Sequence, residues 1–244
     1  MNEITKALMK AFVSLLHPRM LLLMLWPVVI ALVLWLGLAF AFWSQAAAWL
    51  QMQFDQSDMI AWAIGFWPLT YFATHLAWIL LVLLFIPVVL ITAVVIIGVF
   101  AMPAMVKHVA ERDYPSLERR EGGTFAGSVW NSVAAMIWLV LFALLTLPLW
   151  FFPPLWPLLP IPLFGYLNQR VYRYDALGEH ASAGEMQMLI RRDRGALFLL
   201  GMAVALVGLI PIFGFFVPVY GGLVFIHYCL ARIAQLREEP VATQ

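Results

Sequence analysis

Charged residues are scarce in this sequence. They make up 11% of its 244 residues, against about 25% in ordinary soluble proteins, while hydrophobic residues make up 64%. The mean hydropathy is +0.93. So few charges cannot cover the surface of a soluble domain of this length. Together with uncharged runs longer than a single membrane crossing needs, the composition predicts an all-α integral membrane protein.

Cysteine and catalytic motifs are also missing. The one cysteine, Cys229, excludes an intrachain disulfide, and its apolar surroundings favour a small buried side chain over a reactive thiol. The sequence contains no Walker loop, dinucleotide-binding glycine motif, HExxH motif or Cys–His cluster at metal spacing. We therefore predict no catalytic residue, no metal site and no cofactor. The net charge of +1 gives no reason to expect a nucleic-acid partner.

The first uncharged run covers residues 20–54. It predicts a spanning helix from residue 21 to about residue 43, because about 20 apolar residues cross a bilayer. The polar stretch that follows, QMQFDQSD at 51–58, contains acids but no Lys or Arg. Since Lys and Arg mark cytoplasmic segments, we place this stretch outside.

The second uncharged run covers residues 59–106 and has no polar loop to divide it. Prolines divide it instead. We predict an interfacial segment at 59–67 and then a long, tilted helix at 69–102, kinked near Pro87.

The N-terminal residues 3–16 show an amphipathic pattern. Their apolar face consists of Ile4, Leu8, Phe12, Leu15 and Leu16. This pattern predicts a helix at the cytoplasmic membrane interface, which ends at His17 because Pro18 disfavours helix in the residue before it. We treat residues 1–244 as a single membrane domain with an interfacial helix at 1–17 and a loose tail at 238–244.

Residues 195–231 are uncharged and are broken by Pro211, Gly214 and Pro218. These three residues predict a structural hinge between two helices, since proline cannot continue a helix interior and glycine tolerates a turn. The arms, 195–210 and 219–231, are about 24 and 20 Å long, shorter than the ~30 Å core of a bilayer. Basic residues flank both ends, which favours a re-entrant hairpin. A spanning hairpin with a tight apolar turn remains the alternative.

An earlier hairpin has the same character. Residues 122–169 are uncharged and contain WFFPPLWPLLPIP, with five prolines between 153 and 162. We predict helices from 125 to about 150 and from 164 to 174 on either side of this break. The sequence does not decide whether this hairpin spans or re-enters.

Polar segments fix the expected orientation. Ser182, with Glu185 three residues later, forms a capping-box pattern that predicts a cytoplasmic helix at 183–192. Every Lys and Arg lies before residue 20, between 107 and 121, between 170 and 194, or after 231. Both termini are therefore predicted to be cytoplasmic.

Four stretches stand in a characteristic order: HPRMLLLMLWP, AMPAMVKHVAERDY, YRYDALGEHAS followed by EMQMLIRRDR, and LIPIFGFFVPVYGG. In order and spacing they resemble the CysZ-type sulfate permease family and the wider etoposide-induced-protein-like membrane family. The resemblance implies two long transmembrane helices, two proline-broken and partly penetrating hairpins, and amphipathic cytoplasmic helices. It also implies sulfate uptake for cysteine synthesis across a bacterial inner (plasma) membrane, and assembly as a homo-oligomer.

One stretch departs from this resemblance. The family carries a Gly-apolar-Arg-Arg stretch, associated with sulfate binding, where this chain has Arg19, Met20, Leu21 and Leu22 after Pro18. Leucines thus replace the paired arginines. Arg19 remains as a cation at the start of the first spanning helix, where unpaired helix N–H groups are expected, and is the leading substrate-binding candidate.

Other ionisable residues are weaker candidates. Five arginines are candidates to line an anion vestibule: Arg170, Arg173, Arg191, Arg192 and Arg194. The last three are kept as substrate-binding candidates, although the charge rule alone accounts for all five. His75 and His227 lie in apolar stretches, where we favour a hydrogen-bonded core histidine over a proton or ligand site.

Two functions follow from these observations. The leading one is a membrane permease or channel for an oxyanion, with sulfate as the substrate that the resemblance implies and with membrane lipid as surroundings. The alternative is a non-transporting membrane scaffold or assembly protein with the same fold, which the loss of the paired arginines favours. An enzyme acting on lipid is a distant third.

Overall fold

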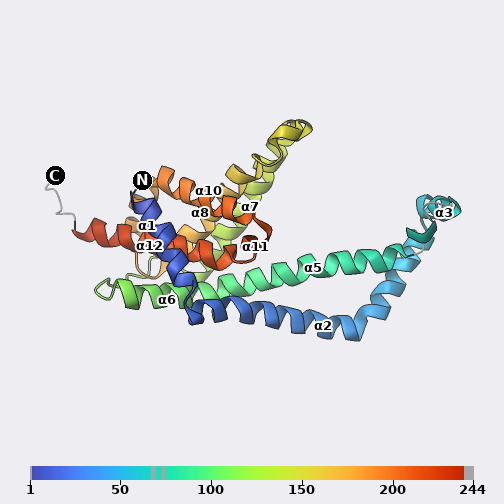
Figure 1. Cartoon of the computed structure of the whole chain (residues 1–244), viewed down its shortest axis with the longest axis horizontal. Helices are drawn as coiled ribbons and strands as arrows, with labels where there is room; N and C mark the ends of the chain where they lie inside the picture. Colours follow the sequence, from blue (N-terminus) through green and yellow to red (C-terminus); the bar gives the residue numbers. More distant parts are fainter. Residues whose placement is uncertain (1, 67–69, 73–74, 239–244) are drawn as a thin grey trace. The chain divides into compact units, whose positions relative to one another are not determined.

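The computed structural model describes residues 2–66, 70–72 and 75–238 (Figure 1). Every regular element in these residues is helical, which confirms the all-α membrane class. Among them, four helices are long and apolar enough to cross a membrane: Pro18–Asp55, Leu76–Asp113, Phe125–Leu145 and Val217–Glu238. Of the predicted tail at 238–244, all but the first residue lies outside the described residues.

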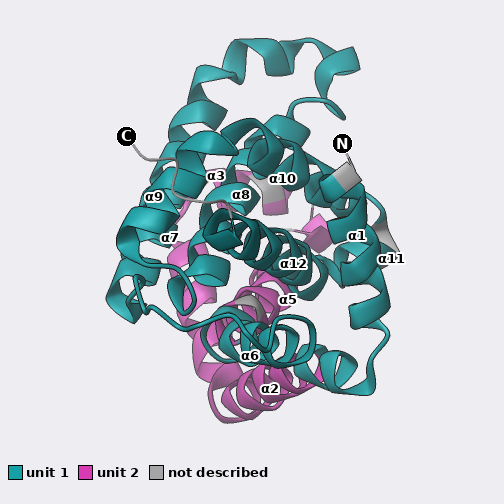
Figure 2. Cartoon of the chain, turned by 90° about the vertical axis from the view of Figure 1, so that its left-hand side faces the viewer, with its two compact units in different colours: residues 1–24, 97–244 teal, residues 25–96 magenta. Residues whose placement is uncertain are grey.

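The chain forms two compact units, which Figure 2 shows in different colours. Unit 1 comprises residues 1–24 and 97–244, and unit 2 comprises residues 25–96. Each is described by itself below. The single domain predicted over 1–244 stays a prediction.

Unit 2 contains most of helix α2 (Pro18–Asp55), with α3 (Asp58–Gly65) and α5 (Leu76–Ile96). Helix α2 continues well past the predicted end near residue 43 and includes the first part of the polar stretch 51–58. No proline or glycine follows Gly37 within it, and its alanines at 46–48 are strong helix formers. Polarity alone therefore did not end the helix.

Helices α2 and α5 pack against each other within unit 2. Ala31 lies buried with Val89 and Ala93 at their contact, and Trp35 Nε1 donates a hydrogen bond of 2.9 Å to Thr92 Oγ1. Most other side chains of these helices are apolar and exposed, which suits a surface in contact with lipid.

The predicted long helix at 69–102 is interrupted close to its end. After α5 the chain forms a π-helical segment, η1 (Ile97–Ala101), and continues as α6 (Met102–Asp113). The wider turn comes directly before Pro103, which has no N–H to donate to the preceding turn. The break in regular α-helical bonding thus accompanies Pro103, and the kink predicted near Pro87 stays a prediction.

The first hairpin of unit 1 begins with α7 (Phe125–Leu145), whose N-cap Thr124 accepts a hydrogen bond of 3.0 Å from Gly127 N. The proline-rich segment forms two short 3-10 helices, η2 (Leu147–Phe151) and η3 (Pro153–Leu155). Helix α8 (Pro160–Gly178) then starts earlier and ends later than predicted. Its prolines lie in the first turn, where a missing N–H costs nothing.

After α8 the described chain of unit 1 continues through α9 (Ala183–Arg192), α10 (Arg194–Gly208), α11 (Pro211–Gly214) and α12 (Val217–Glu238). The capping box is confirmed, since Glu185 N donates to Ser182 Oγ (3.2 Å) and Ser182 N donates to Glu185 Oε2 (2.8 Å). Helix α12 passes beyond the predicted end at residue 231. Its length makes it a candidate span, while re-entry of either hairpin stays a prediction.

The core of unit 1 lies where α8, α10 and α12 meet. Helices α8 and α10 approach so closely that a Cβ on Gly201 would lie 2.2 Å from the Gly165 carbonyl oxygen. Helix α1 (Asn2–Leu15) packs along α12 through Ala7 and Ala11. The described α1 agrees with the helix predicted at 3–16, but Phe12 of its predicted apolar face is half exposed.

Candidate functional site

Basic side chains gather at the start of α2. Arg19 is the second residue of this helix and is exposed, and its backbone N donates to His17 Nδ1 at 3.3 Å. The His17 ring lies 5.2 Å, centroid to centroid, from the ring of His108 on α6. Arg19 is also close enough to His108 to interact with it electrostatically. One guanidinium and two imidazoles therefore share this part of unit 1.

The amides of the first turn of α2 are already bonded. Met20 N and Leu21 N donate to the carbonyl oxygen of His17 at 2.9 and 3.2 Å, and Arg19 N uses the His17 ring. Pro18 has no N–H. The unpaired helix donors expected beside Arg19 are thus taken, so an anion here would contact side chains.

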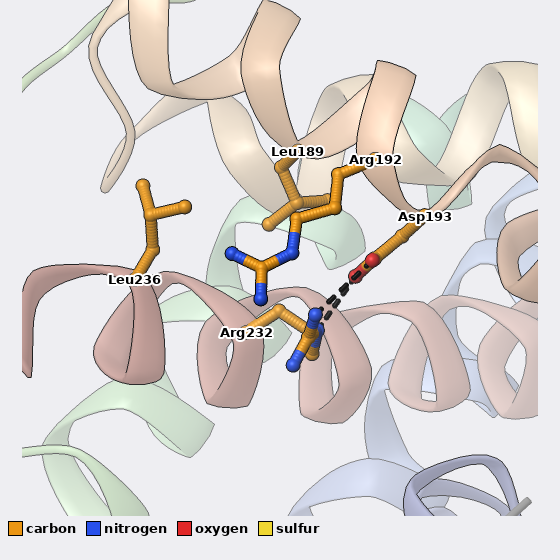
Figure 3. A pocket seen from close by; sticks show the side chains of 5 residues that line it. All are labelled: Leu189, Arg192, Asp193, Arg232 and Leu236. Carbon is orange, nitrogen blue, oxygen red and sulfur yellow. Dashed lines mark hydrogen bonds and ion pairs between the residues drawn. The ribbon is translucent and has the colours of Figure 1, made fainter. Parts of the chain in front are cut away.

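Arg191, Arg192 and Arg194 surround the junction of α9 and α10. Arg192 lines a small cavity together with Leu189, Asp193, Arg232 and Leu236, as Figure 3 shows. Its volume is about 10 Å³, which is room for about one water molecule and not for an oxyanion. Arg191 and Arg194 are exposed. The structure therefore brings Arg192 and Arg232 together but does not gather the three predicted arginines around one space.

Asp193 lines the same cavity. Its carboxylate accepts from Arg232 Nε at 2.6 Å and from Arg232 Nη2 at 3.1 Å (Figure 3). It also accepts from the Tyr228 hydroxyl at 3.1 Å. A two-point contact between arginine and carboxylate is among the strongest hydrogen-bonded pairs in proteins. Asp193 thus already holds the position that an anion would take beside Arg232.

Glu185 plays the same part for the end of α12. It accepts from Arg237 Nε at 2.9 Å and Arg237 Nη2 at 3.1 Å, and from Arg120 Nη1 at 2.8 Å. The hydrogen bonds from Arg237 lower the pKa of Glu185 to about 2, although burial acts in the opposite direction. Arg237 also donates to the carbonyl oxygens of His180 and Glu118, so it joins three segments of unit 1.

Arg170 and Arg173 lie one turn apart on α8 and are half-buried. Arg170 Nη1 donates to the Tyr166 hydroxyl at 2.6 Å and Arg170 Nε to Asn131 Oδ1 at 3.4 Å. Arg173 Nη1 donates to Gln169 Oε1 at 2.7 Å. All three partners are neutral. In the part of the chain that the structure describes, neither guanidinium forms an ion pair.

His227 is buried on α12 and links three segments. Its Nε2 lies 2.9 Å from Ser14 Oγ on α1, and its Nδ1 lies 3.5 Å from Asp113 Oδ2 at the end of α6. Serine, histidine and aspartate also form hydrolytic triads. Here, however, Ser14 is in a helix and only 9% exposed, and the contact to Asp113 is longer than an ordinary hydrogen bond. We assign the array to packing of α1 on α12, in line with the predicted hydrogen-bonded histidine.

His75 makes local contacts within unit 2. Its Nδ1 lies 2.9 Å from the carbonyl oxygen of Tyr71, and the two rings stack 4.6 Å apart. Unit 2 also has an apolar groove of about 300 Å³ between α2 and α5, lined by residues such as Trp35, Phe42 and Leu84. Its lining is almost wholly apolar and carries no charged side chain, and the Trp35 N–H already donates to Thr92, so the groove is poorly suited to an anion.

The hinge residues lie between α10 and α12. Pro211 opens α11, Gly214 closes it, and Pro218 is the second residue of α12. A Cβ on Gly214 would lie 3.0 Å from the carbonyl oxygen of Gly208, which is a tight approach to backbone. The short helix α11 lies between α10 and α12, and the role of these three residues as a hinge stays a prediction.

A family profile described as sulfate transporter CysZ/etoposide-induced protein 2.4 matches residues 7–218. The chain belongs to this family. The match covers Arg19, the first hairpin and the first arm of the second hairpin, and it ends at the second residue of α12. No curated protein and no solved structure matches the chain. The chain is thus a membrane protein of a transporter family, and its resemblance to the CysZ type is confirmed.

Sequence reasoning missed the most tightly bonded charges. Asp193 and Glu185 hold Arg232 and Arg237, which are 39 and 52 residues further along the chain. The one signal for Glu185 was its capping box, which is a local pattern. His108 lacked any signal that pointed to Arg19, because the two lie on different helices.

Proposed function

We propose that the protein is a permease for a tetrahedral oxyanion, with sulfate as the substrate, in a bacterial inner membrane. Membership of the sulfate transporter CysZ/etoposide-induced protein 2.4 family supports transport of an anion as the class of function. The observation that carries the site is the grouping of Arg19, His17 and His108 at the start of α2. A guanidinium offers five N–H donors in a fixed plane, and each imidazole adds a ring N–H without needing a charge.

The proposal includes an orientation and an assembly. Both termini lie on the cytoplasmic side, because all fourteen Lys and Arg residues fall in segments that this orientation keeps there. The basic group around Arg19 then faces the cytoplasm. The protein assembles as a homo-oligomer, as expected for the family.

Replacement of Arg19 tests the site. A charge-assisted hydrogen bond contributes about 1.5–3 kcal/mol, so Arg19→Ala should weaken sulfate binding roughly tenfold or more. Arg19→Lys should recover part of the affinity, because the charge stays while the planar fork is lost. Calorimetry on purified protein in mild detergent measures this, with selenate and chloride as comparison anions.

A matched control is Arg119→Gln. Arg119 is exposed, and replacing it removes the same single charge from unit 1 without touching the start of α2. Its affinity for sulfate should equal that of the wild type. Radiolabelled sulfate uptake into proteoliposomes then tests transport itself.

The scaffold function is the second candidate, because Leu21 and Leu22 stand where the family has paired arginines. Wild-type protein that binds no oxyanion at millimolar concentration and shows no flux would favour the scaffold and end the permease proposal. If Arg19→Ala binds sulfate as tightly as the wild type does, the binding site lies elsewhere on the chain.

A further inference from the structure

Four arginines of unit 1 are partly buried on α8 and α12, and only two of them have carboxylate partners. Arg232 and Arg237 on α12 each contact a carboxylate at 2.6 and 2.9 Å. Arg170 and Arg173 on α8 contact neutral oxygens instead. The charge rule explains why arginines occur in this segment, but it does not explain why two of them lack an acid.

The positions of Arg170 and Arg173 make this absence costly. They are three residues apart on one helix, so their side chains share a face and their charges repel each other. Half-buried charges require a partner of opposite sign or strong solvation. Asp175, the one acid of α8, is engaged elsewhere, because its carboxylate accepts a short hydrogen bond from Ser128 Oγ on α7.

The surroundings hold these side chains in place and leave donors available. Asn131 Nδ2 donates to the Arg170 carbonyl oxygen at 2.8 Å, while Asn131 Oδ1 accepts from the Arg170 side chain. The Tyr166 hydroxyl accepts from Arg170, so its own hydrogen is still able to bond. Arg173 uses one of its five N–H groups on Gln169. Donors of fixed position without a charged acceptor are what a desolvated anion needs.

Helix α8 is itself firmly positioned. It lies between α7 and α10, and its Gly165 meets Gly201 of α10 at backbone distance. Asn168 Nδ2, two residues before Arg170, donates to the Gly201 carbonyl oxygen at 3.3 Å. The arginine pair therefore stands on one helix, α8, which is packed against α7 and α10, and not on a loop.

We propose that Arg170 and Arg173, with the Tyr166 hydroxyl, form a second binding site for a doubly charged tetrahedral oxyanion. This inference rests on the proposed function for its ligand, sulfate, but not on Arg19 as the first site. The anion supplies the negative charge that Arg170 and Arg173 do not receive from their neutral partners. Two sites of moderate strength suit transport, because a bound ion must also be able to leave.

Gln169→Glu is the sharpest test of this site. The change is nearly isosteric and puts a carboxylate where the amide oxygen already accepts from Arg173 at 2.7 Å. Glu four residues before Arg also favours an ion pair on a helix. The internal carboxylate should replace the anion, so sulfate affinity of the site should fall at least tenfold without loss of folded protein.

Gln235→Glu is the matched control. Gln235 Oε1 accepts from Arg232 Nη1 at 2.6 Å, in the same way as Gln169 accepts from Arg173. Arg232 already has Asp193 as its carboxylate, so this variant adds the same charge beside an arginine that is not available to sulfate. Its sulfate binding should equal that of the wild type.

Radiolabelled sulfate binding to purified full-length protein is measured in the wild type, in Arg19→Ala, and in Arg19→Ala combined with Gln169→Glu or Gln235→Glu. We expect residual binding in Arg19→Ala that Gln169→Glu removes and Gln235→Glu keeps. Equal residual binding in both double variants would overturn the second site while leaving the permease proposal intact. Wild-type protein without any sulfate binding would overturn both.

Arg170→Gln combined with Arg173→Gln provides an independent check. This double variant removes the donors, whereas Gln169→Glu fills the site, and both should lose the same class of binding. If sulfate binding is lost in the double arginine variant but not in Gln169→Glu, the arginines act through packing. The proposal of a second site would then be wrong. Melting temperature in sulfate-free buffer identifies any variant that fails to fold.

Discussion

The arginines of α12 and those of α8 differ in what neutralises them. Arg232 and Arg237 are held by Asp193 and Glu185, each through two guanidinium nitrogens. Arg170 and Arg173 are comparably placed in the same unit but contact only neutral oxygens. The comparison teaches that one set of charges joins segments of the fold, while the other set is left to interact with something outside the chain.

The largest expected effect comes from taking the carboxylate away from α12. In Asp193→Asn, Arg232 loses its two-point partner while remaining mostly buried, and breaking a buried pair typically costs about 3–5 kcal/mol. The free energy of unfolding in detergent should therefore fall by about 3 kcal/mol or more, measured by denaturant titration.

Glu111→Gln is the control for this change. The Glu111 carboxylate lies 3.9 Å from Lys107 Nζ, and both side chains are 63% exposed. An exposed pair of this kind contributes about 0–1 kcal/mol, so the loss should be small. An equally small loss in Asp193→Asn would contradict the idea that α12 is held by its ion pairs.

The second-largest expected effect is that acid weakens the ion pair between Glu185 and Arg237 of α12. The pKa of Glu185 falls from an ordinary 4.5 to about 2 in the folded protein. A lowered folded pKa means that the stabilisation is complete above pH ~4.5 and is lost as pH falls toward 2. Since a pKa difference of one corresponds to ~1.4 kcal/mol, this carboxylate contributes on the order of 3–4 kcal/mol at neutral pH.

Glu185→Gln isolates that contribution. Stability measured between pH 7 and pH 3 should decline less steeply in the variant than in the wild type, because one titrating group with a lowered pKa is gone. The variant should also be less stable than the wild type at pH 7. Parallel pH profiles would show that other carboxylates dominate the acid response.

Local rules predicted much of the fold. The capping box at Ser182 and Glu185 and the start of α7 after Thr124 each depend on residues within a few positions, and the structure has both. The ends of α2 and α12 were wrong because polar or charged residues were taken as helix ends. In α12, Arg232 and Arg237 remain helical because distant carboxylates bind them.

The candidate site was harder to predict for the same reason. Arg19 stood out by its place before an uncharged run, but its neighbour His108 comes from another helix. Ser14 and His227 meet although 213 residues separate them. The neutral partners of Arg170 were equally invisible, because a missing acid is recognised only after the surrounding helices are in place.

The smallest expected effect on stability comes from the arginines of α8. Combined replacement of Arg170 and Arg173 by Gln breaks no ion pair and removes a repulsion, so unfolding in sulfate-free buffer should change by less than about 1 kcal/mol. Added sulfate should stabilise this variant less than it stabilises the wild type. At a ligand concentration one hundred times Kd, one occupied site stabilises the folded state by ~2.7 kcal/mol. This variant should lack the stabilisation that comes from sulfate bound at Arg170 and Arg173. Thermal unfolding with increasing sulfate measures that stabilisation, and sodium chloride at equal ionic strength controls for screening.

If the variant gains as much stability from sulfate as the wild type does, α8 holds no anion and the contrast between the two helices concerns packing alone. If it unfolds in sulfate-free buffer as readily as Asp193→Asn, the neutral partners on α8 stabilise the fold as strongly as the carboxylates facing α12 do, and the contrast itself fails.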